Sequence, residues 1–443
     1  MLNSEQAKDR AADLIARAVK AGADAADAVY SADASTQVQM RLGALEDVER
    51  SEGEDMALRV FVGGRLASAS TSDLSPAALD ALAARAVAMA REAPVDAYAG
   101  LAPAERLMRG AMPMLDLDDD QDVSPQTLKE RALAAENAAL AVAGVTNSQG
   151  AGASTSRAVF ALATSHGFTG GYSGSSHGIS AGVLAGAGGD MQRDYAYSSV
   201  RHLSDLEDAA SVGAEAGRRA VARMNPIKLK SGAMPVVFDP RVSSSMLGHL
   251  IGAITGGAIA RKTSFLLDAL GTAIFARGVS VIDDPHIVRG LRSRPFDGEG
   301  LSTSLTKIID GGVLTTWLVD STAGRQLDLP PTGHATRGGA GPSNLHMAAG
   351  DVTPADLMAD IKDGFYVTEM IGMGVNGLTG DYSRGASGFR IENGQLTVAV
   401  AEVTIAGNLK DMFAALIPAN DLEFRYATNA PTLRIDGMML AGD

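Results

Sequence analysis

The chain has 443 residues, of which 46% are hydrophobic and 20% charged, an ordinary globular composition with ample apolar residues for a core. Its 38 basic and 52 acidic residues give a net charge of −14, which argues against nucleic-acid binding, since that binding relies on clustered Lys and Arg. A chain without cysteine can form no disulfide, thiolate zinc site or cysteine nucleophile.

The first residues predict an amphipathic helix rather than a secretory signal, because Leu14, Ile15, Ala18 and Val19 share one face. The longest apolar stretch, 246–260, is shorter than the ~20 residues that span a bilayer. We therefore expect a cytoplasmic protein that does not enter a membrane.

Residues 1–92 form the first predicted unit, in which helices and strands alternate. The strand-like runs 56–62 and 65–70 flank Gly63-Gly64, a two-residue hairpin turn. Ser75-Pro76 then supplies an N-cap and a first-turn proline for a helix.

Residues 93–123 are rich in Pro, Ala and Asp, and they predict a solvated linker between two units. Five aspartates crowd into its end: Asp116, Asp118, Asp119, Asp120 and Asp122. Such a run could bind calcium, but it lacks the loop glycine and the terminal glutamate of an EF-hand. A linker in water is the favoured interpretation.

The middle unit, 124–226, is predicted to contain a helix, an antiparallel meander and a second helix. The residues 204–207 read as the capping box of that second helix. Within the meander, His166 and His177 stand in similar Ser-His-Gly triplets and could face each other on a hairpin. As a metal pair they lack a third ligand nearby, so structural turn positions are favoured.

The third unit, 231–443, shows strands joined by hairpins around Asp310-Gly311 and Asn393-Gly394, with a helix opened by Thr353-Pro354. Strands paired in this way, with helices between them, predict an α+β protein with antiparallel sheets. The run 372–377 matches G-x-G-x-x-G, but no helix signal follows it, so a dinucleotide site is not indicated.

Met246–Lys262 reads MLGHLIGAITGGAIARK and predicts an apolar helix with a single histidine. A metallopeptidase helix needs two histidines about one turn apart and a glutamate, so that the ligands converge and the carboxylate activates water. His249 stands alone, and packing within a buried helix is favoured over a ligand role.

Basic residues cluster at His286, Arg289, Arg292 and Arg294. They could hold a carboxylate or a phosphate. Ion pairs with the neighbouring acidic residues are favoured; these are Asp283, Asp284, Asp297 and Glu299.

The loop 332–338 is polar and glycine-rich, and we expect it to expose His334 and Arg337 to ligands. These two residues, with His286, Arg292 and Arg294, are the candidate substrate or interface contacts.

Several segments, from the middle unit to the C-terminus, resemble the TldD/PmbA family and follow the family's order. They are MQRDYAYS at 191–198, RKTSFLLD at 261–268, DDPHIVRGLRSRPFDGEG at 283–300, TGHATRGG at 332–339, GFYVTEMIGMGVNGLTGDYSRGASGF at 364–389, AGNLKDMF at 406–413 and APTLRIDGMML at 430–440. The first unit matches the family only in its layout.

The family has a TldD branch, whose chains carry an HExxxH helix and a distal cysteine, and a PmbA branch, also called TldE, without its own metal. Alignment at Gly252 sets Gly248 and Ala253 against the two histidines and His249 against the glutamate. A shift by one residue places His249 on the first histidine, but leaves no glutamate and no second histidine. The chain therefore resembles the PmbA branch, with no catalytic residue and no metal ligand of its own.

The resemblance implies a heterodimeric, cytosolic metallopeptidase that degrades short or unfolded peptides, with zinc in a TldD-like partner subunit. This chain would close the proteolytic chamber. It also implies a smaller N-terminal α+β domain followed by a larger, mostly antiparallel C-terminal domain with helices.

Two alternatives remain open. The chain could be a stand-alone scaffold or homodimer, whose glycine-rich C-terminal strands accept an extended peptide. It could also be a cryptic hydrolase that uses His334, His286 or the pair His166 and His177.

Overall fold

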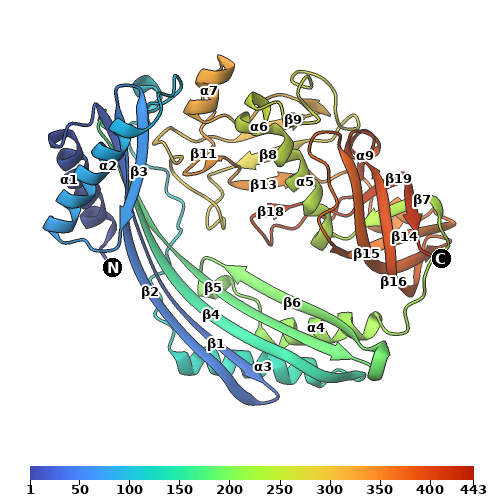
Figure 1. The fold of residues 1–443 in the computed structure, drawn as a ribbon. Helices are drawn as coiled ribbons and strands as arrows, with labels where there is room; N and C mark the ends of the chain where they lie inside the picture. The colour runs from blue at the N-terminus through green and yellow to red at the C-terminus, as the bar shows by residue number, and fades with distance from the viewer.

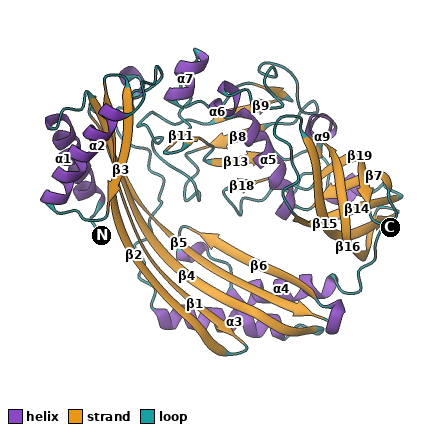
Figure 2. Cartoon of the chain, in the orientation of Figure 1, coloured by secondary structure: helices purple, strands orange, loops and turns teal.

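A computed structural model describes residues 1–443, apart from the side chain of Asp190. A long, curved antiparallel sheet forms one half of the molecule, and residues 231–443 lie on its concave side (Figure 1, Figure 2). The observed fold is the predicted mixed α+β architecture with mostly antiparallel sheets.

The long sheet has the strand order β3-β2-β1-β4-β5-β6, and every neighbouring pair in it is antiparallel. Its strands are β1 (Ala25–Arg41), β2 (Ala44–Val62), β3 (Arg65–Thr71), β4 (Val145–Thr164), β5 (Thr169–Ala185) and β6 (Gln192–Val200). Because β1 pairs with β4, the segments 1–92 and 124–226 contribute three strands each to one continuous sheet.

Four helices cover the convex face of this sheet (Figure 1). They are α1 (Ser4–Lys20), α2 (Pro76–Glu92), α3 (Pro125–Leu140) and α4 (Ala209–Ala222). Ser75 caps α2 as predicted, and positive φ angles of 58° and 71° at Gly63 and Gly64 make the predicted hairpin turn. The predicted capping box at 204–207 is wrong, because Asp208 caps α4 and Leu203–Asp205 forms a short 3-10 turn.

The C-terminal half contains a sheet of order β16-β15-β14-β7-β19-β17, in which β16 also pairs with β19 and closes the strands into a barrel. These strands are β7 (Gly232–Phe238), β14 (Asp363–Ile371), β15 (Asp381–Glu392), β16 (Gln395–Asn408), β17 (Ile417–Pro418) and β19 (Leu433–Ala441). The predicted hairpin around Asn393-Gly394 joins β15 to β16.

A second C-terminal sheet has the order β10-β9-β8-β13-β18 and lies beside a small hairpin, β11-β12. Its strands are β8 (Val281–Asp284), β9 (Thr306–Asp310), β10 (Val313–Leu314), β13 (Asn344–Met347) and β18 (Thr428–Asn429), and the hairpin is β11 (Ala335–Thr336) with β12 (Gly339–Ala340). The turn between β9 and β10 is Gly311-Gly312, one residue later than predicted.

Five helices belong to the C-terminal half: α5 (Pro240–Ile254), α6 (Gly256–Ala260), α7 (Ser321–Leu327), α8 (Pro354–Met358) and α9 (Leu409–Ala415). The predicted continuous helix 246–262 is wrong: α5 begins at Pro240, and the helix breaks at Thr255. Thr255 is extended (φ −64°, ψ 136°), forms a β-bridge with Leu318 and caps α6. The two glycines that follow it disfavour helix continuation.

The segment 93–123, here called the strap, is not the predicted solvated linker. It passes between the long sheet and the C-terminal half, where Leu115 and Leu117 are buried. The backbone N–H groups of Arg289 and Ser175, one from each half, donate to the carbonyls of Leu115 and Leu117 at 2.8 and 2.9 Å. Apolar side chains that alternate with the aspartates give the strap a buried face, and composition alone concealed this.

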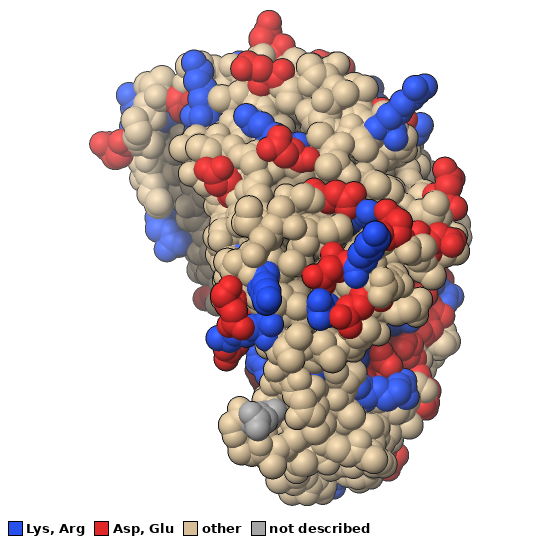
Figure 3. Space-filling model, turned by 90° about the vertical axis from the view of Figure 1, so that its right-hand side faces the viewer, with Lys and Arg blue, Asp and Glu red and all other residues tan. Residues whose placement is uncertain are grey.

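The surface carries both charge signs. Figure 3 shows acidic and basic side chains interspersed over one face of the molecule, without a large area of one sign. Among the described residues, no helix combines the length and the apolarity that crossing a membrane requires.

Candidate functional site

The α5 cavity is a hollow of about 510 Å³ between α5 and the edge of the long sheet. It is lined from β6, the end of α4, α5, β14, β15 and β18. The lining residues are Arg193, Asp194, Tyr195, Arg223, Arg241, Val242, Ser244, Ser245, Gly248, Thr368, Glu369, Met370, Arg384 and Thr428. The cavity thus collects residues from both halves of the molecule against the helix that the sequence singled out.

Four arginines and two carboxylates give the cavity lining an excess of two positive charges. Asp194 is almost fully buried and accepts from Arg241 at 3.0 Å, with Arg223 at 3.5 Å. Arg223 also pairs with Glu369, which lies 3.7 Å from Arg193. Burial would lower the pKa of Arg241, but the carboxylates of Asp194 and of Asp239, which lies outside the lining, hold it above its ordinary value.

Arg384 differs from the other three arginines because it has no counterion. Its guanidinium makes no ion pair or hydrogen bond with any described residue, and its Nε is buried. Arg384 belongs to β15, two residues after Tyr382, and lies near His249 of α5.

His249 lies against the edge of the Tyr382 ring, with ring centroids 5.7 Å apart. Its buried Nε2 has no hydrogen-bond partner among the described residues. Burial, and then the positive charge of Arg384, lower the pKa of His249 below its ordinary value, so the ring is neutral at pH 7.

The residues that the predicted alignment sets against the metal motif do not fit a zinc ion. Gly248 offers no ligand atom, Ala253 is buried and apolar, and the unpaired charge of Arg384 beside His249 opposes a cation. No cluster of three His, Cys, Asp or Glu side chains suited to a metal occurs within the part of the chain that the structure describes. We derive no catalytic step through a metal at this helix.

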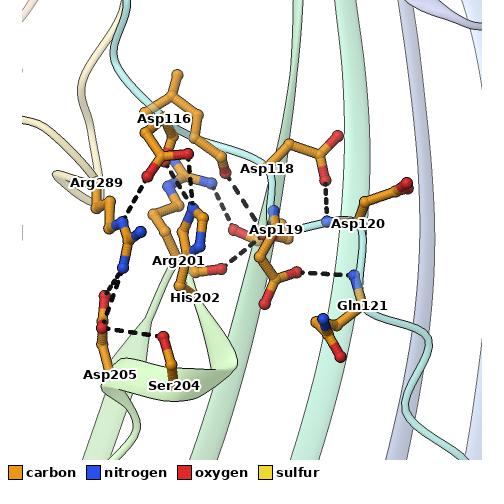
Figure 4. Close-up of polar contacts among 12 residues, drawn as sticks. Asp116, Asp118, Asp119, Asp120, Gln121, Arg201, His202, Ser204, Asp205 and Arg289 are labelled. Atoms are coloured by element: carbon orange, nitrogen blue, oxygen red, sulfur yellow. Dashed lines mark hydrogen bonds and ion pairs between the residues drawn. The ribbon is translucent and has the colours of Figure 1, made fainter.

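The aspartates of the strap form ion pairs with residues of the sheet and of the C-terminal half, and Figure 4 shows Asp116 between Arg289 and His202. Arg289 binds Asp116 at 2.6 Å and Asp205 at 3.0 Å, which holds the pKa of the Asp205 carboxyl below its ordinary value. Arg157 of β4 binds Asp118 and Asp120, both at 2.8 Å. These basic partners compensate part of the negative charge of the acidic run, and they fasten the strap to both halves.

Asp119 is the most buried of the strap aspartates, with a side chain 5% exposed. Its Oδ2 lies 3.0 Å from His177 Nε2 and accepts from the Leu203 amide at 2.8 Å. Burial by itself would raise the pKa of the Asp119 carboxyl, but the amides of Leu203 and Gln121 and the His177 ring hold it below its ordinary value. His177 therefore contacts the strap at Asp119. His166 lies in the β4–β5 turn and also contacts the strap, at the Ala102 carbonyl, at 2.8 Å.

The predicted ion pairs around 283–299 are wrong. Arg289 binds aspartates of other segments, and Arg294 donates to the carbonyls of Ala335 and Gly341 at 3.4 and 3.1 Å. Arg292 is exposed, and His286 binds the Thr303 hydroxyl at 3.0 Å. The acidic neighbours instead hold loops in place. Asp283 binds Ser343, Asp297 accepts from the amide of Ala335, and Glu299 binds Ser321.

The predicted exposure of His334 is also wrong, because its ring is buried, 3.3 Å from Asp283. Arg337 reaches the long sheet, where it binds the buried Asp27 of β1 at 2.5 Å. A glycine-rich sequence looks like a free loop, yet this one is fixed by contacts with two distant strands. None of the five predicted contact residues, His286, Arg292, Arg294, His334 and Arg337, lines the α5 cavity.

The arginines of the α5 cavity were missed because they are far apart in the sequence. Arg193 and Arg384 do lie inside segments that carried the family resemblance, and this was the available signal. Arg241, one residue into α5, gave no local hint of a role.

Comparison with known proteins gives matches along nearly the whole chain. Family models described as the PmbA/TldA metallopeptidase C-terminal domain, central domain and domain 1 match residues 231–442, 118–224 and 26–90. The chain is 39% identical over 421 residues to metalloprotease PmbA of Escherichia coli O157:H7, covering 95% of this chain and 92% of that protein. The chain belongs to the PmbA/TldD metallopeptidase family.

Other members of the PmbA/TldD family agree with this assignment. A metalloprotease PmbA homolog of Haemophilus influenzae is 36% identical over 431 residues, covering 96% of this chain and 94% of the homolog. A crystal structure from Bacteroides thetaiotaomicron, of a protein described as a candidate modulator of DNA gyrase, superposes with a TM-score of 0.93 at 29% identity and full coverage of both chains. TldE of Thermococcus kodakarensis shares the fold, with a TM-score of 0.86 at 19% identity over 98% of this chain and all of that one.

Proposed function

We propose that this chain is the metal-free, TldE-like subunit of a heterodimeric, cytoplasmic metallopeptidase. A TldD-like subunit would carry the zinc and cleave the peptide bond. The observation that supports this proposal is the set of residues on α5, where Gly248, His249 and Ala253 stand at the positions of the HExxxH motif. The misfit of this helix to a cation, described above, points the same way.

The role of the chain in this complex is to close a chamber that admits short or unfolded peptides. Two hollows between the long sheet with its helix α4 and the C-terminal half support such a role, since each is lined by residues of both halves. A second hollow of about 490 Å³ adjoins the α5 cavity, since Arg241 lines both. Exposed Tyr195 and Tyr197 of β6 offer apolar contact area beside these hollows for an extended chain.

Co-purification from the native host tests the proposal. We expect a TldD-like chain at a one-to-one ratio, zinc in the complex but not in this chain alone, and peptide hydrolysis only by the complex. Stoichiometric zinc and peptide hydrolysis in the isolated chain, both lost on His249→Ala, would overturn the proposal.

The second candidate function is a stand-alone homodimer that binds peptides without catalysis. It is favoured by β6, an edge strand that pairs only with β5 and could accept an extended peptide along its other side. Purification of the chain without a TldD-like partner, as a dimer that binds peptides and does not cleave them, would support it. Hydrolysis by the isolated chain that survives a chelator would instead indicate a cryptic hydrolase.

A further inference from the structure

Arg384 places an uncompensated positive charge at the α5 cavity. Its Nε is buried without a partner, and no described carboxylate lies within ion-pair distance of its guanidinium. His249 of α5 lies near Arg384, and an imidazole carries no negative charge that could compensate the guanidinium. Arg384 is half-buried, so the desolvation of its buried Nε is not offset by any described protein group, and a charged side chain of this kind in a cavity is a candidate for ligand binding.

The surrounding charges do not remove this excess. Asp194 and Glu369 are already held by Arg223 and Arg241, at the contacts given above, and Arg193 reaches Glu369 only at 3.7 Å. The electrostatic potential inside the cavity is therefore positive, and it favours the binding of an anion.

The shape of the cavity suits one end of a peptide. Its volume of about 510 Å³ lies within the ~300–1,000 Å³ of ordinary ligand sites. Room is available next to α5, because a Cβ at Gly248 would meet no atom within 4 Å. A guanidinium matches a carboxylate with two parallel hydrogen bonds.

We propose that the α5 cavity binds a carboxylate of a peptide, with Arg384 as its principal ligand. The carboxylate is either the α-carboxylate at the C-terminus or the side chain of Asp or Glu. The anion site follows from the cavity alone, and only the peptide nature of the ligand rests on the proposed function.

Fluorescence anisotropy with the full-length chain tests this site. The probes are a labelled, unstructured alanine-rich peptide without acidic residues and with a free C-terminus, the same peptide with a C-terminal amide, and the amide with one internal Glu. We expect the free acid to bind at least about tenfold more tightly than the amide, as for one lost charge pair. Recovery of affinity by the Glu-bearing amide identifies a side-chain carboxylate as a ligand, and no recovery restricts the site to the C-terminus.

Arg384→Gln should abolish the difference between the acid and the amide. The control Arg50→Gln, at an exposed arginine of β2, should retain it. Equal binding of all three peptides, absence of peptide binding, or an undiminished preference for the carboxylate-bearing peptides in Arg384→Gln would each overturn the carboxylate site. If the complex still cleaves peptides in any of these cases, the proposed function survives without this inference.

Thermal unfolding provides a second test, because an arginine with a purely structural role would give a different result. Because Arg384 has no counterion among the described residues, Arg384→Gln should leave the melting temperature unchanged or raise it. A clear fall in the melting temperature would show that Arg384 stabilises the fold, and it would overturn the role of Arg384 as a ligand.

Discussion

Replacement of Asp119 by Ala tests whether the strap is part of the folded core. The substitution leaves the Leu203 and Gln121 amides without their acceptor and removes the carboxylate from the buried ring of His177. Breaking a buried charged contact costs about 3–5 kcal/mol, and each orphaned buried amide about 1–3 kcal/mol. Since Gln121 is exposed and can bind water, we expect a loss of about 3–5 kcal/mol in the free energy of unfolding.

Denaturant titration at pH 7 and limited proteolysis measure this loss. Asp119→Ala should unfold at lower denaturant and should be cleaved within 93–123, where the wild type resists. Asp122→Ala is the matched control, because Asp122 is exposed in the same segment and its loss should change stability by less than about 0.5 kcal/mol.

The effect should depend on pH with a definite sign. The pKa of Asp119 is lower in the folded protein than its ordinary ~3.9, so its stabilising contribution is complete above about pH 4 and disappears as the pH falls through the folded value. The difference between wild type and Asp119→Ala should therefore shrink in strong acid. Equal stability and equal protease resistance of the two proteins at pH 7 would refute the assignment of the strap to the core.

Three further predictions concern packing and charge. Gly213→Ala should lower the free energy of unfolding by about 1–3 kcal/mol, because its Cβ would lie 1.9 Å from a backbone oxygen of α3. Gly252→Ala should raise the free energy of unfolding by up to about 1 kcal/mol, because its Cβ would meet nothing within 4 Å. Denaturant titration compares the two variants. Because the folded pKa of His249 lies below its ordinary ~6.5, unfolding takes up a proton as the pH falls below that value, so His249→Leu should reduce the loss of melting temperature between pH 7.5 and pH 5. Arg337→Met should cost about 1–2 kcal/mol in denaturant titration, since it leaves the buried Asp27 with only one of its two arginine partners; no change would show that this ion pair contributes nothing.

Local chemistry in the sequence was enough to predict the turns and caps. Gly63-Gly64 and Asn393-Gly394 adopt the positive φ angles that two-residue hairpins need, and Ser75 caps its helix through its own side chain. Pairing between distant strands was not predictable in this way. The β1–β4 pairing joins Ala28 to Ala163, and no local period specifies which strand meets which.

The same distinction explains what was missed in the site. The sequence directed attention to α5 because a motif with known spacing was visibly incomplete there. The cavity depends on Arg193, Arg241 and Arg384, which three separate elements bring together only after the halves have folded. The strap was misjudged for the opposite reason, because its acidic residues suggested solvation while their basic partners lay on other segments.

The charges around α5 give a physical reason why the proposed absence of metal ligands and the positive charge of the α5 cavity occur together. A divalent cation attracts carboxylates and neutral imidazoles and is repelled by an unpaired guanidinium at short range. In the proposed alignment Gly248 and Ala253 stand in place of histidines; a positive side chain such as Arg384 then conflicts with no metal, and the open space beside Gly248 is available to an anion. The proposed loss of hydrolysis and the proposed carboxylate site beside α5 are therefore physically compatible, since a positive potential that disfavours a cation favours a carboxylate of a peptide.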